Sequence, residues 1–303
     1  MLYSRAAVYF DEVARRGSIK KASETLNIAP SAIDRQVSQL EERLGVALFE
    51  RLRTGIRLTA AGEILIDTIR RGRREIERAE SVIDDLRGLR RGRVSLAIAE
   101  GAAEFLSQAI ATFHDAYPNI DFDLHVAEAQ TVLTSLQSGA TDIGLTFNPP
   151  AEPGIRVERS LIYQMGAVVL PSDPLAAQGA MTLGSLADRS LILPDHSLTL
   201  RALFDQAWQK IVGDPLRAVI STNSISVLKS SVGQGLGIGV LTHFDVWKEV
   251  RSGELAFIPF DDQKIPLSVL SALSLAGRAL SSPAALFMQH LSNVMASQSE
   301  PSI

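Results

Sequence analysis

The sequence predicts a small N-terminal helical domain that ends in a two-stranded hairpin, then one long helix, then a larger α/β domain of two lobes. Three patterns predict this fold class. Apolar residues recur at helical spacing over residues 18–44, a heptad-like repeat follows over residues 59–92, and strand and helix patterns alternate over residues 93–303. A chain of 303 residues is long enough for two or three hydrophobic cores.

Two short helices joined by a turn are predicted between Ser18 and Leu44. Ser18 is the expected N-cap of the first, and Asn27 to Ala29 form the turn. The first helix places Ile19, Ala22 and Leu26 toward the core, and the second begins at Pro30 and places Ile33, Val37, Leu40 and Leu44 there. The opposite face of the second helix is a polar ridge, suited to a DNA major groove, of Ser31, Asp34, Arg35 and Ser38. An ordinary helical hairpin with a solvated face has the same spacing.

An arginine-rich hairpin follows the two helices. Residues 51–58 are expected to form two short strands around Arg53, Thr54 and Gly55, with Leu52, Ile56 and Leu58 available for the core. Arg53 and Arg57 are expected to face solvent, where guanidinium groups can neutralise phosphate. A hairpin of this kind beside a recognition helix makes a winged helix-turn-helix.

The long helix predicted after Thr59 has a narrow apolar seam at intervals of three and four. The seam consists of Leu65, Ile69, Gly72, Ile76, Ala79, Ile83 and Leu86. Because charged residues flank it closely, we expect the seam to pair with the same helix of a second copy. The alternative is a helix that lies on its own domain.

The remaining residues show the alternation that is typical of parallel sheets with crossover helices. Strands are expected at 94–99, 121–126, 143–147, 163–170, 191–193, 218–222, 239–241 and 266–272, with helices at 105–117, 131–138, 200–211, 225–232, 244–250 and 283–295. Crossovers near 147–153 and 260–266 divide this region into two lobes, about 93–150 with 266–303 and about 160–260. A cleft between the lobes is the expected ligand site.

Residues 6–66 resemble the winged helix-turn-helix of the LysR-type transcriptional regulators. The resemblance rests on Phe10, Gly17-Ser18, Ala22-Ser23, Leu26, Ala32 to Val37, Leu40-Glu41, Leu44-Gly45, Leu48 to Arg51 and Leu58 to Gly62. Ala116 to Pro118, Gly139, Asp142 to Gly144, Arg201, Gly233 to Leu241 and Gly253 to Leu255 resemble the effector domain of that family, which is similar to periplasmic binding proteins. The resemblance implies a DNA-binding domain at 1–58, a linker and dimerisation helix at 59–92, and an effector-binding domain at 93–303.

The function that this resemblance implies is sequence-specific transcriptional regulation under the control of a small-molecule effector. DNA contacts are expected from Lys20, Lys21, Pro30, Ser31, Asp34, Arg35, Gln36, Ser38, Arg53, Thr54 and Arg57. Effector contacts are expected from Glu100, Gly101, Ala102, Ala103, Gln130, Thr131, Phe147, Asn148, Pro194, Ser197, Thr199, Arg201, Thr222, Asn223 and Ser224. The expected partners are operator DNA, the effector, RNA polymerase and further copies of the chain, as a homodimer or tetramer.

Two departures from the family pattern bear on specificity. Asp34 stands where a serine is usual, so it either accepts a hydrogen bond from a cytosine amino group or caps its helix. The turn after the first strand of the effector domain begins with Glu100 and has no hydroxyl residue. The effector is then neutral or carries an amine near Glu100, with any acidic group near Arg201 or the turn at 222–224. Alternatively, Glu100 faces solvent or pairs with a base.

Composition narrows the remaining classes of function. Residues 1–93 hold 19 Lys and Arg against 14 Asp and Glu, whereas the rest of the chain is acidic, as expected for a DNA module joined to a body that does not touch DNA. The chain has no cysteine, and its five histidines are scattered, so we expect no enzyme activity, cofactor or metal site. The glycines at 233–239 follow a helix and precede a strand, the reverse of a phosphate-binding loop. No signal peptide or membrane span is apparent, which favours the cytosol.

Two rival interpretations remain. In one, the protein is a solute-binding or enzymatic α/β protein whose N-terminal helices only assemble subunits. In the other, it is a molybdate-type regulator, a class that also carries a winged helix but has a smaller oxyanion-binding domain.

Overall fold

The computed structural model describes residues 4–298 apart from 53–54, 87–90, 214–215 and 263–264. The chain divides into two compact units: residues 1–89 with 138–140, and residues 90–137 with 141–303. The predicted change from linker helix to effector-binding domain, at 92–93, falls close to this division, and residues 87–90 lie outside the described ones.

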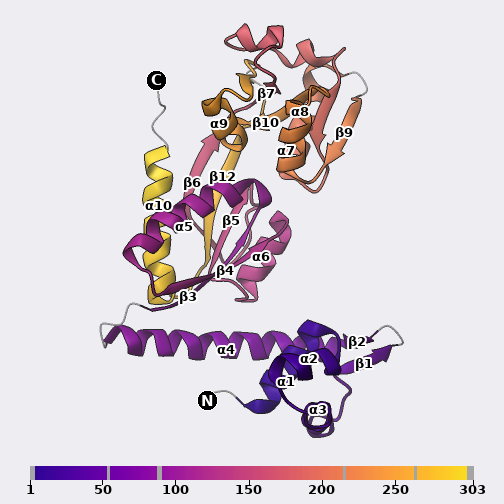
Figure 1. Ribbon diagram of the computed structural model, residues 1–303, viewed down its shortest axis with the longest axis vertical. Coiled ribbons are helices and arrows are strands. Elements are labelled where there is room, and N and C mark those ends of the chain that lie inside the picture. The colour runs from indigo at the N-terminus through magenta and orange to yellow at the C-terminus, as the bar shows by residue number, and fades with distance from the viewer. Residues whose placement is uncertain (1–3, 53–54, 87–90, 214–215, 263–264, 299–303) are drawn as a thin grey trace. The chain divides into compact units, whose positions relative to one another are not determined.

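The N-terminal unit consists of α1 (Arg5–Arg16), α2 (Ile19–Leu26), α3 (Pro30–Leu44), β1 (Phe49–Leu52), β2 (Gly55–Leu58) and α4 (Ala60–Leu86) (Figure 1). The Ser18 hydroxyl accepts a hydrogen bond from the Lys21 N–H and caps α2, as predicted. Asn27 ends that helix in the left-handed conformation, at φ 53°, and Pro30 occupies the first position of α3. β1 and β2 pair antiparallel, which confirms the hairpin.

The core of this unit lies among the first three helices, where Val13, Ala22, Ile33 and Val37 are buried together. Two expected core residues are instead exposed: Leu44 by 47% and Leu52 by 51%. Each is the last residue of its element, α3 or β1. The periodic pattern there continues beyond the part of the element that packs against a neighbour.

The first half of α4 lies against its own unit. Ile66 and Ile69 are buried in a cluster with Phe10 and Leu48, and the Arg70 guanidinium donates to Asp11 of α1. Further along α4, Ala79 and Ile83 are exposed. The proposed seam therefore begins inside the core of the N-terminal unit and continues onto an exposed helical surface; the Leu86 side chain lies outside the described ones.

The first lobe of the C-terminal unit is a five-stranded sheet in the order β4-β3-β5-β12-β6. Its elements are β3 (Gly92–Ile98), α5 (Ala103–Ala116), β4 (Ile120–Val126), α6 (Ala129–Gln137), β5 (Ile143–Phe147), β6 (Ile155–Tyr163), β12 (Ser268–Leu275) and α10 (Ser282–Gln298). α5 and α10 share a core with one face of the sheet, and α6 packs with Leu273 on the other.

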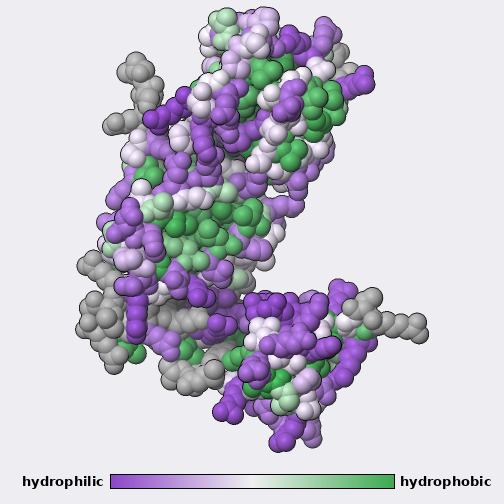
Figure 2. Space-filling view, viewed as in Figure 1, coloured by the Kyte–Doolittle hydropathy of each residue, from purple (hydrophilic) through white to green (hydrophobic). Residues whose placement is uncertain are grey.

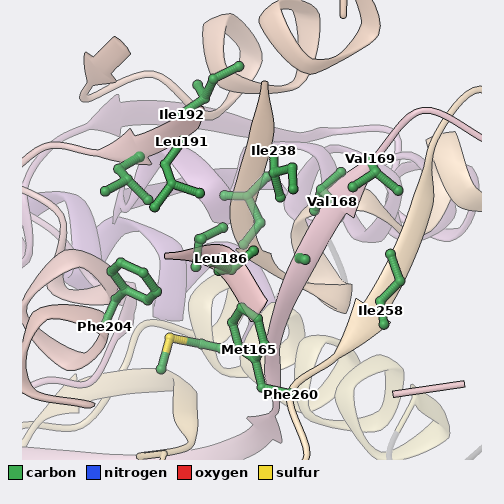
Figure 3. Packing of buried hydrophobic residues seen from close by; sticks show 14 of the residues in the cluster. Met165, Val168, Val169, Leu186, Leu191, Ile192, Phe204, Ile238, Ile258 and Phe260 are labelled. Carbon is green, nitrogen blue, oxygen red and sulfur yellow. The ribbon is translucent and has the colours of Figure 1, made fainter. Parts of the chain in front are cut away.

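The second lobe has the strand order β11-β7-β10-β8-β9. It contains β7 (Met165–Val169), β8 (Leu191–Pro194), α7 (Thr199–Ile211), β9 (Ala218–Thr222), α8 (Ile225–Gly233), β10 (Ile238–Thr242), α9 (His243–Ser252) and β11 (Ala256–Pro259). Figure 3 shows its apolar core, in which Met165, Phe204 and Phe260 lie among aliphatic residues of the strands. α8 leads through the glycines at 233–239 into β10, so these glycines form a helix-to-strand turn, as predicted.

Two expectations about the sheets are wrong. Both sheets are mixed rather than parallel, because β12 runs antiparallel to β5 and β6, and β7 runs antiparallel to β10 and β11. The first crossover is not at 147–153: β6 still pairs with β12 in the first sheet, and the chain enters the second sheet after Gln164. The sequence pattern did not indicate β6 because six of its nine residues are exposed, nor β11, which has four residues.

Candidate functional sites

The polar face of α3 is accessible in the N-terminal unit. Ser31, Arg35 and Ser38 are exposed there, as are Pro30 at the helix start and Lys20 and Lys21 on α2. Gln36 is half-buried, and its amide donates to Gln39 one turn later. On the hairpin Arg57 is exposed, whereas Arg53 and Thr54 lie outside the described residues.

Asp34 of α3 pairs with an arginine that the sequence analysis did not select. The Arg51 guanidinium of β1 donates to the Asp34 carboxylate at 2.6 Å, and the side chains are 67% and 43% exposed. Asp34 does not cap its helix, because α3 starts four residues earlier and its N-cap, Ala29, has no side-chain hydrogen bond. The pair joins the recognition helix to the wing across 17 residues of sequence. The sequence feature that could have indicated this ion pair is an acidic residue on the polar ridge, followed along the chain by an arginine-rich strand.

A cavity of about 380 Å³ lies between the two lobes of the C-terminal unit. Figure 2 shows apolar residues gathered on the visible face of the first lobe, below this interlobe region. The walls of the cavity come from strand ends and helix starts of both lobes. They consist of Ala99, Glu100, Gly101, Val126, Ala127, Glu128, Ala129, Thr146, Phe147, Ser197, Leu198, Thr199, Leu200, Asn223, Ser224, Ile225, Thr242, Asp245 and Ser268. A cavity of this size is typical of small-molecule sites.

Seven of the residues that the sequence analysis selected line this cavity: Glu100, Gly101, Phe147, Ser197, Thr199, Asn223 and Ser224. The other eight are Ala102, Ala103, Gln130, Thr131, Asn148, Pro194, Arg201 and Thr222. Of these, Ala102 is buried in the core of the first lobe, and the Asn148 amide side chain hydrogen-bonds to β12. The selection missed Glu128, Thr146 and Asp245. Glu128 lies three residues before the helix predicted at 131–138. Asp245 completes a capping-box pattern with Thr242, which indicates a helix start but no ligand contact, and no short-range pattern marks Thr146.

Arg201 is engaged within the second lobe. Its guanidinium donates to Asp205 at 2.7 Å and to the Pro194 carbonyl at 2.9 Å, and only 11% of the side chain is exposed. It does not line the cavity. Arg201 is therefore a structural cation of α7, and the expectation that it receives an acidic group of the effector loses its support.

Glu100 bridges the two lobes. Its carboxylate accepts from the Ile225 N–H at 2.9 Å, from the Ser224 hydroxyl at 3.3 Å and from the Ser226 N–H at 3.5 Å. These donors form the first turn of α8, where free N–H groups and the helix dipole favour a negative charge. Glu100 is half-buried, and it forms no ion pair with a basic side chain in the part of the chain that the structure describes. Ser224 also caps α8, because its hydroxyl accepts a hydrogen bond from the Val227 N–H.

Asp245 lies buried at the start of α9, between the lobes. One carboxylate oxygen, Oδ2, accepts from the N–H and the hydroxyl of Thr242. Oδ1 points toward the first lobe, since a Cβ at Gly101 would lie 3.0 Å from it, and it accepts no hydrogen bond from the described residues. Burial raises the pKa of Asp245 to about 6, although the Thr242 hydrogen bonds and Lys229 act in the opposite direction.

Among the described residues, no group of three His, Asp or Glu side chains is arranged to hold a metal ion. No helix in the described ranges is both long and apolar enough to cross a membrane.

A winged helix-turn-helix joined to a two-lobed α/β domain with an interlobe cavity defines a ligand-responsive DNA-binding regulator. Residues 4–63 match the family model for the bacterial regulatory helix-turn-helix protein of the lysR family, and residues 87–296 match that for the LysR substrate binding domain. The chain belongs to the LysR family of transcriptional regulators, whose members are DNA-binding proteins with an effector domain rather than enzymes.

Relatives and solved structures agree with this assignment. The RuBisCO operon transcriptional regulator of Allochromatium vinosum is 26% identical over 246 residues, which cover 81% of each chain. The crystal structure of full-length CbnR with its target DNA has a TM-score of 0.69 at 20% identity and covers 96% of this chain and 99% of that one. The CcmR regulatory domain of Synechocystis PCC6803, solved with 2-PG, has a TM-score of 0.59 at 22% identity over 67% of this chain and 97% of its own.

Proposed function

We propose that this regulator reads operator DNA with α3 and the β1–β2 hairpin, and that its effector binds in the cavity between the lobes. The observation that carries the effector site is the cavity itself, because both lobes contribute to its wall. A ligand there contacts both lobes at once, so its binding free energy depends on how they are arranged.

The DNA-binding part of the proposal assigns different roles to two arginines. Arg35, exposed on the polar ridge of α3, reads a base edge, whereas Arg57, exposed on the hairpin, contacts phosphate. Arg35→Ala is expected to cost roughly 1–3 kcal/mol and to relax the preference at one operator position, whereas Arg57→Ala weakens binding to all sequences alike and flattens the salt dependence. Fluorescence anisotropy with operator and scrambled duplexes measures both effects. An Arg35→Ala protein with unchanged affinity and specificity removes that residue from the reading surface.

The effector part of the proposal can be tested before the effector is known. A thermal-shift screen of metabolites, with 2-PG included, identifies compounds that stabilise the full chain. Asn223 lines the cavity and is exposed, whereas the exposed Ser221, two residues earlier, does not line it. Asn223→Trp is expected to abolish the stabilisation and Ser221→Trp to leave it. Equal stabilisation in both variants places the ligand elsewhere.

The assembly that we propose is a homodimer or tetramer paired through the second half of α4. Its support is the exposed apolar surface that includes Ala79 and Ile83. Two copies then place two winged domains on two half-sites of one operator. A regulator of this kind acts in the cytoplasm and contacts RNA polymerase, which a pull-down with the operator-bound protein tests.

A further inference from the structure

We propose that the interlobe cavity selects a ligand with an ammonium group and excludes simple carboxylates and phosphates, an inference that rests on the cavity being the effector site. Three carboxylate residues, Glu100, Glu128 and Asp245, line the cavity, and none of the described residues that line it is Lys, Arg or His. An acidic ligand would therefore enter a site that already holds like charges and offers no cationic side chain.

The helix start that would best hold an acid is already filled. Glu100 accepts from the Ile225 N–H, the Ser226 N–H and the Ser224 hydroxyl, so the protein's own carboxylate occupies the N-terminus of α8. An acidic ligand would have to displace Glu100, which would then remain uncompensated at the edge of the same cavity. Arg201 offers no alternative, since it is paired with Asp205.

The remaining helix starts do not reverse the sign of the charge. α6 and α7 begin with the lining residues Ala129 and Thr199, and each N-terminus is equivalent to about half a positive charge. Together with the start of α9, which carries Asp245, the three N-termini amount to about one and a half charges, less than the two carboxylates of Glu128 and Asp245. Lys229 also faces Asp245, but it pairs with Glu249 at 2.7 Å and with Glu104 at 3.7 Å. Even when the N-terminus of α8 balances the charge of Glu100, the cavity keeps a net negative charge.

Two polar atoms in the cavity wall have no hydrogen-bond partner among the described residues: the buried Thr146 hydroxyl and Asp245 Oδ1, which requires a donor. Asp245 is 9% exposed, and its Oδ1, which faces Gly101, accepts no hydrogen bond. Thr146 is fully buried, and its hydroxyl has no partner. Residues two apart in a strand share a face, so the Thr146 side chain lies on the same face of the first sheet as Gly144. That face is the α6 side, because a Cβ at Gly144 would meet Val132 and Leu136.

An ammonium group suits the acceptor at Asp245 Oδ1 and could equally donate to the Thr146 hydroxyl. It supplies three N–H donors and a positive charge, so it can donate to Asp245 Oδ1 and to a further acceptor of the cavity wall. An alcohol can donate one hydrogen bond without relieving the charge, and a carboxylate can donate none. The pKa of Asp245, raised by burial to about 6, leaves this carboxyl ionised near neutral pH, where it attracts a cation.

The experiment compares n-butylamine, 1-butanol and butyrate, which share an alkyl chain and differ in their polar group, by ligand-observed saturation-transfer NMR with the full chain. Butylamine is expected to bind, butyrate not to bind, and butylamine binding to be lost in Asn223→Trp. Asp245→Asn is expected to weaken butylamine roughly tenfold or more, as for the loss of a charge-assisted hydrogen bond. The control Glu254→Gln removes an exposed carboxylate outside the cavity and is expected to leave binding unchanged.

The outcomes separate this inference from the proposed site. Butyrate binding that is lost in Asn223→Trp, or no butylamine binding at the highest concentration at which the chain stays folded, overturns the ammonium inference and leaves the cavity as the effector site. Because Asp245→Asn also changes the start of α9, Thr146→Val and Glu128→Gln provide independent checks, each expected to weaken butylamine. If Asn223→Trp affects neither the binding of the probes nor the stabilisation by the screened metabolites, the cavity is not the effector site, and both proposals are overturned.

Discussion

Replacing Asp245 by asparagine is expected to change how the stability of the C-terminal unit depends on pH. The free energy of unfolding of Asp245→Asn minus that of the wild type should be larger at neutral pH than in mild acid. Asparagine keeps an acceptor for the Thr242 hydrogen bonds but carries no charge. The charged groups that face Asp245 are Glu100 of the first lobe and Lys229 of α8, and Tyr163 lies close enough to be affected by it. Substituting the one carboxyl isolates its own titration.

The magnitude follows from the shift of the Asp245 pKa, from 3.8 to about 6. A shift of about two units corresponds to about 3 kcal/mol, since each unit is worth ~1.4 kcal/mol. The folded state favours the protonated acid, so this stabilisation is complete below pH 3.8 and is lost as the pH rises through 6. About half of the loss, on the order of 1 kcal/mol, falls between about pH 5 and pH 7.5, and Asp245→Asn should not show it.

Tryptophan fluorescence during urea unfolding measures this quantity on the full chain. The only two tryptophans, Trp208 of α7 and Trp247 of α9, both lie in the C-terminal unit, so the signal reports on that unit alone. Asp188→Asn, a change at an exposed aspartate, controls for the loss of one charge. A difference between wild type and Asp245→Asn that is the same at pH 5 and pH 7.5 would refute a raised pKa for Asp245.

Three further outcomes are expected in the two units. Ile83→Asp should dissociate the dimer in sedimentation velocity, whereas Ile64→Asp, at a 71% exposed isoleucine of the same helix outside the seam, should not; equal behaviour would refute the seam. Asp34→Ala and Arg51→Ala should each weaken operator binding, and each substitution should weaken it by less in a protein that already carries the other substitution. Additive losses in this double-mutant cycle would show that the pair does not act in recognition. Gly144→Ala should cost about 1–3 kcal/mol in urea unfolding, because its Cβ would lie 2.7 Å from Leu136, and an unchanged midpoint would show that α6 yields.

Local patterns were sufficient for most of the helices and for the hairpin. The Ser18 cap, the proline at the start of α3 and the strand at Ile143–Phe147 depend on neighbouring residues, and each was found where the sequence placed it. Strand β6 was missed because only one of its nine residues, Leu161, is fully buried. Its partner β12 follows more than a hundred residues later, so its pairing is invisible to any short window.

The same limit applies to the interlobe cavity. Resemblance and short-range pattern selected the turns at its edge, including Glu100 and Ser224. They did not select Asp245, which the sequence pattern places only in the first turn of the helix predicted at 244–250. That its second oxygen faces Gly101 depends on how the two lobes pack against each other. Arg201 shows the converse, because a neighbouring helical turn supplies Asp205 as its partner.

One short segment of the first lobe provides much of the polar contact with the second. Glu100 accepts from the start of α8, and Glu104, one turn later, pairs with Lys248 of α9 at 3.0 Å and with Lys229 of α8 at 3.7 Å. Glu100 and the start of α8 also line the cavity. A ligand shifts the arrangement of the lobes only through contacts that differ between arrangements. If the effector binds beside Glu100, as proposed, it changes the environment of a carboxylate that joins the lobes, so we expect the pairing of this segment with α8 to respond to occupancy of the cavity.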